Sequence, residues 1–112
     1  MSKASYWQRG ETIDYKNLTD KKIDANTILV IGSRIGIAGT EILPNETGSL
    51  HVTGVFKMDK KPSEAITAGV EVYFDSTAGN ITATASASGV KAGFAVEAAA
   101  ADDAGVAVKI NA

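Results

Sequence analysis

The sequence contains no cysteine, one histidine and two prolines among its 112 residues. The missing cysteines exclude disulfide bonds, thiolate chemistry and zinc sites built on cysteine, and one histidine alone does not complete a typical zinc site. No apolar run approaches the roughly 20 residues that a helix needs to span a membrane, and residues 1–17 lack the apolar core of a signal peptide. We therefore expect a protein that is made and used without secretion and has no membrane partner.

An excess of charge of either sign is also missing. The chain carries 11 basic and 13 acidic residues, for a formal net charge of −2. Proteins that bind nucleic acid usually carry a basic excess, so we expect no nucleic-acid partner. The apolar fraction of 45% is that of a folded protein, and the length fits one domain with a modest core.

Short segments of β character cover much of the chain. Branched and apolar residues dominate residues 27–32, as in a strand buried on both faces, and elsewhere apolar and polar residues alternate with the period of a half-buried strand. The alternating segments are 49–57, 70–75, 80–86 and 105–111. Corners rich in glycine and asparagine separate them, and only residues 60–69 and 97–103 have helical character. The pattern predicts an all-β fold, a small β-barrel or sandwich.

The domain organisation follows from the same pattern. Residues 1–17 are polar with scattered aromatic residues and are predicted to form an extended N-terminal arm that ends in a short strand at "TIDYK". Residues 18–112 are predicted to form a single barrel-like domain.

An internal repeat is also visible. Residues 23–30 match residues 66–73 at an offset of 43, and residues 35–38 match residues 92–95 at an offset of 57. The second offset also relates Gly48 to Gly105. The 14 additional residues fall within "FDSTAGNITATASASG", which has no equivalent in the first half. The pattern suggests that each half contains a strand, a turn, a glycine-containing strand, a turn and a final strand.

The glycines of "ANTILVIGSRIGIAG" raise the question of a nucleotide site. A dinucleotide fingerprint requires Gly-x-Gly-x-x-Gly at a turn from strand to helix, but Arg34 follows Gly32 at the position of the second glycine. Pro44 and the corner after it leave no room for a helix, and no lysine completes a phosphate loop. We expect these glycines to let backbones cross or bend at a barrel corner instead.

No other group of residues suggests catalysis. His51 lies in an alternating segment that is typical of a surface or interface position, and the paired acids Asp102 and Asp103 are expected in a turn. No nucleophile, base and orienting residue occur together, and no calcium-binding pattern is present. We therefore expect neither an enzyme nor a bound cofactor or metal.

The N-terminal arm is the most informative feature outside the predicted core. Tyr6 and Trp7 are large rings in a segment too short to form a core of its own. They either fold back over one end of the barrel or dock on another chain, where tyrosine and tryptophan are common anchors. An extended arm can also add a strand to a neighbouring sheet.

Four segments in this order resemble a known family: "QRGETIDY", "IGIAGTEILPNETGSLHVTGVFKMDK", "SEAITAGVEVYFD" and a final Val-x-Val strand. Over roughly residues 4–111 the chain is similar to the capsid decoration, or cement, proteins of tailed bacteriophages, one branch of which is filed as an uncharacterised conserved phage domain. None of the segments is a catalytic motif, so the resemblance rests on their order and spacing.

The resemblance implies a β-barrel or β-tulip like the head decoration protein of phage lambda. It further implies a protein made in the host cytoplasm that binds the outer surface of the expanded capsid, commonly as a homotrimer, and clamps neighbouring major capsid subunits. On this basis the arm residues Tyr6, Trp7, Gln8 and Arg9 are expected to bind the capsid, with Ile13 and Tyr15 fixing the arm to the barrel or to a capsid strand. Truncation of residues 1–15 is then expected to leave a folded domain that no longer binds.

Two other structural roles stay open at this stage. A head–tail connector or tail subunit is also a β-barrel with extended arms. A surface-displayed adhesion module would need a cluster of exposed aromatic residues, whereas aromatic residues make up only 6% of this chain.

Overall fold

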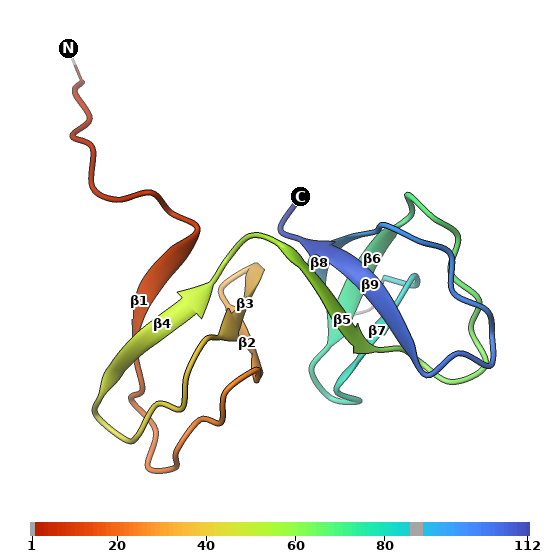
Figure 1. Ribbon diagram of the computed structural model, residues 1–112, viewed down its shortest axis with the longest axis horizontal. Coiled ribbons are helices and arrows are strands. Elements are labelled where there is room, and N and C mark those ends of the chain that lie inside the picture. The colour runs from red at the N-terminus through yellow and green to blue at the C-terminus, as the bar shows by residue number, and fades with distance from the viewer. Residues whose placement is uncertain (1, 86–88) are drawn as a thin grey trace.

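The computed structural model describes residues 2–85 and 89–112 and contains nine strands and no helix in that part of the chain. The strands are β1 (Thr12–Lys16), β2 (Ile28–Ile31), β3 (Arg34–Ala38), β4 (Thr47–His51), β5 (Val55–Asp59), β6 (Glu71–Asp75), β7 (Asn80–Thr82), β8 (Gly89–Ala95) and β9 (Gly105–Ile110). They form two antiparallel sheets in the orders β1-β4-β3-β2 and β5-β9-β8-β6-β7. The sheets lie side by side, joined by the chain between β4 and β5 (Figure 1). The prediction of an all-β fold is confirmed.

The helical character of two segments is not realised. Residues 97–103 contain a turn and an isolated bridge in which Ala99 pairs with Ile66, and residues 60–69 contain turns around Pro62 and Gly69. Alanine propensity is a weak preference that tertiary pairing overrides. Backbone hydrogen bonds of 2.8 and 2.9 Å between Ile66 and Ala99 hold the two segments together at this bridge.

Three strand predictions need adjustment. Residues 27–32 contain β2, but β2 lies at a sheet edge and Val30 is 40% exposed, so this strand is not buried on both faces. The segment 49–57 is divided by a bend before Val55, where Gly54 has a φ of +123° and the chain passes from one sheet to the other. In the segment 80–86 the strand ends at Thr82, and residue 86 lies outside the described part of the chain.

The internal repeat is confirmed by the strand registers. In the first sheet Leu29 of β2 pairs with Gly36 of β3, and in the second sheet Val72 of β6 pairs with Gly93 of β8. These partners are related by the offsets of 43 and 57 that the sequence predicts. We call β1–β4 the first repeat and β5–β9 the second.

The last strands of the two repeats correct one predicted equivalence, that of Gly48 with Gly105. Tyr15 pairs with Gly48, and Met58, which is 43 residues after Tyr15, pairs with Val106. The equivalent of Gly48 is therefore Val106, at an offset of 58, and not Gly105. The second repeat therefore has one more residue in the loop before β9 than the first repeat has before β4. Matching Gly48 to Gly105 by residue type alone did not detect it.

The strand β7 is the main difference between the repeats. It lies in the 14-residue insertion and covers the edge of β6, whereas no strand among the described residues pairs with the outer edge of β2, the counterpart of β6. An isolated parallel bridge between Lys60 and Ile81 joins the two ends of the second sheet. The described residues show no continuous ladder that closes either sheet into a barrel.

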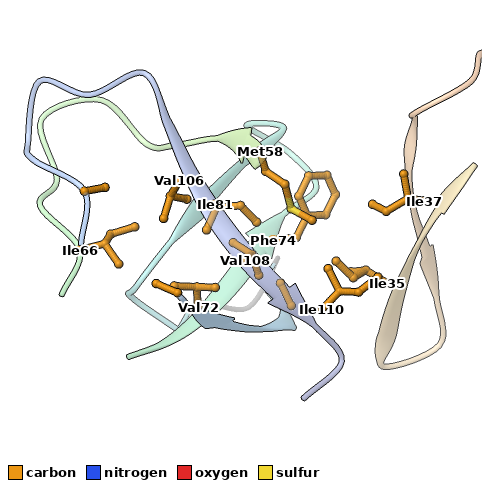
Figure 2. Close-up of a cluster of buried hydrophobic side chains, with 13 residues drawn as sticks. Ile35, Ile37, Met58, Ile66, Val72, Phe74, Ile81, Val106, Val108 and Ile110 are labelled. Carbon is orange, nitrogen blue, oxygen red and sulfur yellow. The ribbon is translucent and has the colours of Figure 1, made fainter. Parts of the chain in front are cut away.

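The main core lies within the second repeat. Its buried side chains gather around Ile81, Val108, Val72 and Phe74 (Figure 2). Ile35 and Ile37 of β3 reach the same cluster from the first sheet and face Ile110 and Phe74 (Figure 2). The two sheets are thus joined by one face of β3.

The side chain of Asn111 reinforces this junction. Its amide nitrogen donates to the carbonyl oxygens of Ile35 and Val52 at 2.8 and 2.9 Å, and its Oδ1 accepts from the Ile35 N–H at 3.2 Å. β3 pairs with β4 at Ile37 and Ala38, and β4 ends at His51, so β4 does not extend beside Ile35. Asn111 therefore supplies the hydrogen bonds that a neighbouring strand would otherwise make.

Glycines of the first repeat, including two in the segment 25–39, have turn and packing roles. Gly32 has a φ of +62° in the turn between β2 and β3. A Cβ on Gly36 would lie 2.5 Å from Leu50 Cγ, and one on Gly48 would lie 2.5 Å from Ile42 Cγ1. Gly36 and Gly48 therefore make room for Leu50 and Ile42 against the sheet, and Gly32 allows the chain to turn after β2. The predicted crossing of backbones is not what the space at Gly36 serves.

Candidate functional site

The N-terminal arm extends away from both sheets (Figure 1). Residues 2–9 have no regular secondary structure, and Tyr6 and Trp7 are 84% and 88% exposed. Gln8 and Arg9 are exposed as well. The rings therefore do not fold back over the end of a sheet, and their docking on another chain stays a prediction.

Ile13 and Tyr15 form a second group, because they belong to β1 rather than to the free arm. They pair with Leu50 and Gly48 of β4 and lie on the same face of the first sheet. Both are half-buried. The six predicted residues thus divide into four on the free arm and two on the sheet to which the arm is attached.

The position of β1 sets the limit of the arm. β1 begins at Thr12, and the carbonyl of Glu11 accepts a hydrogen bond of 3.1 Å from the Val52 N–H. Truncation of residues 1–15 would remove most of a strand from the first sheet. A truncation that spares the sheet ends at residue 10.

Groups capable of chemistry have structural roles where the structure describes them. The ring of His51 packs against Phe56 with centroids 5.9 Å apart, and Asp103 accepts a hydrogen bond of 2.8 Å from the Ala100 N–H within a turn. No group of three or more histidine or acidic side chains positioned to hold a metal occurs among the described residues. Likewise, no helix with the length and apolar character needed to span a bilayer occurs among the described residues.

The carboxylate of Glu64 accepts hydrogen bonds from three residues after β6, Thr82, Ala83 and Thr84. Burial alone would raise the pKa of Glu64, but bonds from the Ala83 N–H and the Thr82 hydroxyl, both 2.9 Å, together with Thr84 and nearby Lys61, hold it below its ordinary value. The carboxylate fastens the segment after β7 to the loop after β5, so its role is structural.

Sequence reasoning missed the buried polar residues that fix the loops. Asn17 is fully buried and donates to the carbonyls of Lys21 and Ile42 at 2.7 and 3.0 Å. At the equivalent position of the second repeat, Lys60 donates through Nζ to three carbonyls, those of Lys61, Glu64 and Ala101. The offset of 43 relates the two residues and is the one sequence signal that could have revealed them.

Comparison with known families identifies the family to which the chain belongs. The family model described as Phage cement protein matches residues 7–110, which include the arm from Trp7 onward and both repeats. The chain belongs to this family. As a phage cement protein it is a structural, non-enzymatic component of the virion that binds and stabilises the capsid. No curated protein and no solved structure matches the chain.

Proposed function

We propose that this cement protein binds the outer surface of the expanded capsid and clamps neighbouring major capsid subunits, with the free arm as its docking segment. The observation that carries the proposal is the exposure of Tyr6 and Trp7, at 84% and 88%. Large rings on an otherwise polar segment are typical anchors of a protein interface. Gln8 and Arg9 add donors that a capsid surface can accept.

The physical properties of the arm are consistent with this role. Fixing a free segment on binding costs conformational entropy, which lowers the affinity of a single copy. Many contacts on one shell, or within a homotrimer at a local three-fold position, compensate for this cost by raising the effective concentration of each arm. The near-neutral charge suits a protein partner better than nucleic acid.

The test is co-sedimentation with expanded capsids that lack the cement protein. The full chain is expected to saturate at a fixed ratio near one copy per major capsid subunit, and a variant without residues 2–10 is expected not to bind. Tyr6→Ala with Trp7→Ala should weaken binding at least tenfold, and Val96→Ala, a change at an exposed apolar residue of the second repeat, is the matched control. Saturation by the truncated chain at the same ratio would overturn the assignment of the arm.

Oligomeric state is measured on the same samples. A homotrimer predicts three times the chain mass of 11.6 kDa in light scattering, either in solution or after release from the capsid. A monomer in both states would contradict the homotrimer. The role of the arm in capsid binding would still be tested by the co-sedimentation experiment.

A further inference from the structure

The second repeat shows how a sheet of this design is completed. The strand β7 pairs antiparallel with β6, placing Phe74 opposite Ile81. The Ile81 side chain is fully buried in the main core, and its carbonyl accepts a 2.8 Å hydrogen bond from the Lys61 N–H. One short strand thus covers the edge of β6 and also fills the inner face of its sheet.

The first repeat has the same ladder without that strand. Leu29 and Ile31 of β2 are equivalent to Val72 and Phe74 by the offset of 43. Val72 and Phe74 are buried, whereas Leu29 and Ile31 are only half-buried. The difference in exposure follows from the missing strand, because Ile81 packs in the same core cluster as Val72 and Phe74.

Other residues that would border the missing strand are incompletely covered as well. Tyr15, the equivalent of the buried Met58, is half-buried. Leu18, which stands 43 residues before Lys61, is 79% exposed. Apolar side chains therefore surround the position that β7 would occupy in the first repeat.

The two edges of the first sheet differ in how they are protected. The β1 edge carries Asp14 and Lys16, and charged residues on an edge strand discourage pairing with another chain. The β2 edge reads Ile-Leu-Val-Ile and has no charge, proline or bulge in its register with β3. An uncharged apolar edge is a template for strand addition. We therefore expect β2 to pair with a strand from a partner.

We propose that the free edge of β2 receives an extended segment of the major capsid protein, antiparallel to β2, at the place that β7 occupies in the second repeat. The proposal rests on the proposed function, since it takes the capsid as the partner. By analogy with Asn80-Ile81-Thr82, the segment presents one aliphatic side chain between hydrogen-bonding residues. With the arm leaving the sheet at the start of β1 and the new contact at β2, two separate parts of the first repeat can hold two capsid subunits.

The arm of a second copy is a poorer fit to this edge. Its large side chains, Tyr6 and Trp7, are adjacent, so in a strand they point to opposite faces. The inner face is already occupied in part by Leu50 and Ile42, which lie against Gly36 and Gly48. An aliphatic side chain is better suited to the remaining space than an indole ring.

Site-specific photo-cross-linking on the capsid tests the contact. A benzophenone amino acid replaces Val30, which is 40% exposed, or in the control Val96, which is 36% exposed. After saturation of expanded capsids and irradiation, position 30 is expected to cross-link to a major capsid peptide that contains an aliphatic residue between polar ones. A cross-link to residues 2–10 of a second copy, or a yield no higher than that of position 96, would overturn the proposal.

A charge variant separates this contact from the cement function itself. Val30→Lys introduces the kind of residue that protects natural edge strands, and it should weaken capsid binding at least tenfold relative to Val96→Lys, with both variants folded by circular dichroism. Equal binding by the two would contradict the edge contact. If the unmodified chain does not sediment with capsids, it is the proposed function that fails.

Discussion

The two repeats share one ladder of strands but differ in how it is buried. In the second repeat β7 completes the core, and Ile81, Val72 and Phe74 are buried. In the first repeat the counterparts of Val72 and Phe74 stay half-buried, and the chain continues from β1 into a free arm. The second repeat thus provides most of the hydrophobic core, while the first leaves an apolar edge and an aromatic arm available to a partner.

The largest expected effect comes from the equivalent glycines Gly93 and Gly36. At Gly93, with a φ of +144°, an alanine Cβ would lie 1.9 Å from the carbonyl oxygen of Lys109, which is backbone and cannot move aside. Gly93→Ala should lower the free energy of unfolding by about 4 kcal/mol or prevent folding. Gly36→Ala meets the buried side chain of Leu50 rather than backbone and should cost about 1–3 kcal/mol. If urea titrations gave equal losses of unfolding free energy for Gly93→Ala and Gly36→Ala, the difference between the backbone contact at Gly93 and the side-chain contact at Gly36 would be contradicted.

Removal of the completing side chain should have the next largest effect. Ile81→Ala leaves a cavity in the main core and should lower the free energy of unfolding by about 2–5 kcal/mol. Val30→Ala, at the exposed edge of the first sheet, should change it by less than about 0.5 kcal/mol. Similar midpoints for the two variants in chemical denaturation would show that β7 does not complete the second core.

The link between the repeats can be weakened at Asn111. Asn111→Ala leaves the N–H and C=O of Ile35 without their side-chain partner, which should cost about 1–3 kcal/mol. Because Asn111 has a φ of +56°, Asn111→Gly is the matched control that removes the amide without adding backbone strain. Amide hydrogen exchange at Ile35 should be faster in both variants, and unchanged exchange would argue against the proposed link.

The smallest expected effect is the acid dependence that Glu64 contributes to the second repeat. The pKa of Glu64 is lowered in the folded protein, so its stabilising contribution is complete above its ordinary value of 4.5 and is lost as the pH falls through the lowered pKa. Glu64→Gln should reduce stability at neutral pH and flatten the acid limb of a plot of unfolding free energy against pH. The equivalent residue of the first repeat is Lys21, and Lys21→Gln should leave the acid limb unchanged.

The sequence predicted the strands and the repeat because alternation and offsets are local patterns. It predicted β6 and β9 to within one residue of their observed bounds. It also predicted the offset of 43 between the repeats. It did not predict that "TILVIG" forms an edge strand, because an apolar run is compatible both with a strand buried in the middle of a sheet and with an edge strand that pairs with another chain. The role of Gly36 and Gly48 depends on side chains from other segments, Leu50 and Ile42, which periodicity does not identify.

For the candidate site, composition alone marked the aromatic residues of the arm, and the structure leaves these exposed. Ile13 and Tyr15 were assigned from the resemblance, and the structure places them on β1, half-buried and paired with β4. The β2 edge was not predicted as a contact, because it emerges only when the two repeats are compared strand by strand.

The most direct test of the account is a cryo-electron microscopy reconstruction of expanded capsids saturated with this protein. We predict that residues 2–10 are ordered against one major capsid subunit on the outer surface, and that an extended segment of a neighbouring subunit pairs with β2. A reconstruction in which the arm stays free of the shell, or in which β2 faces solvent, would contradict the account.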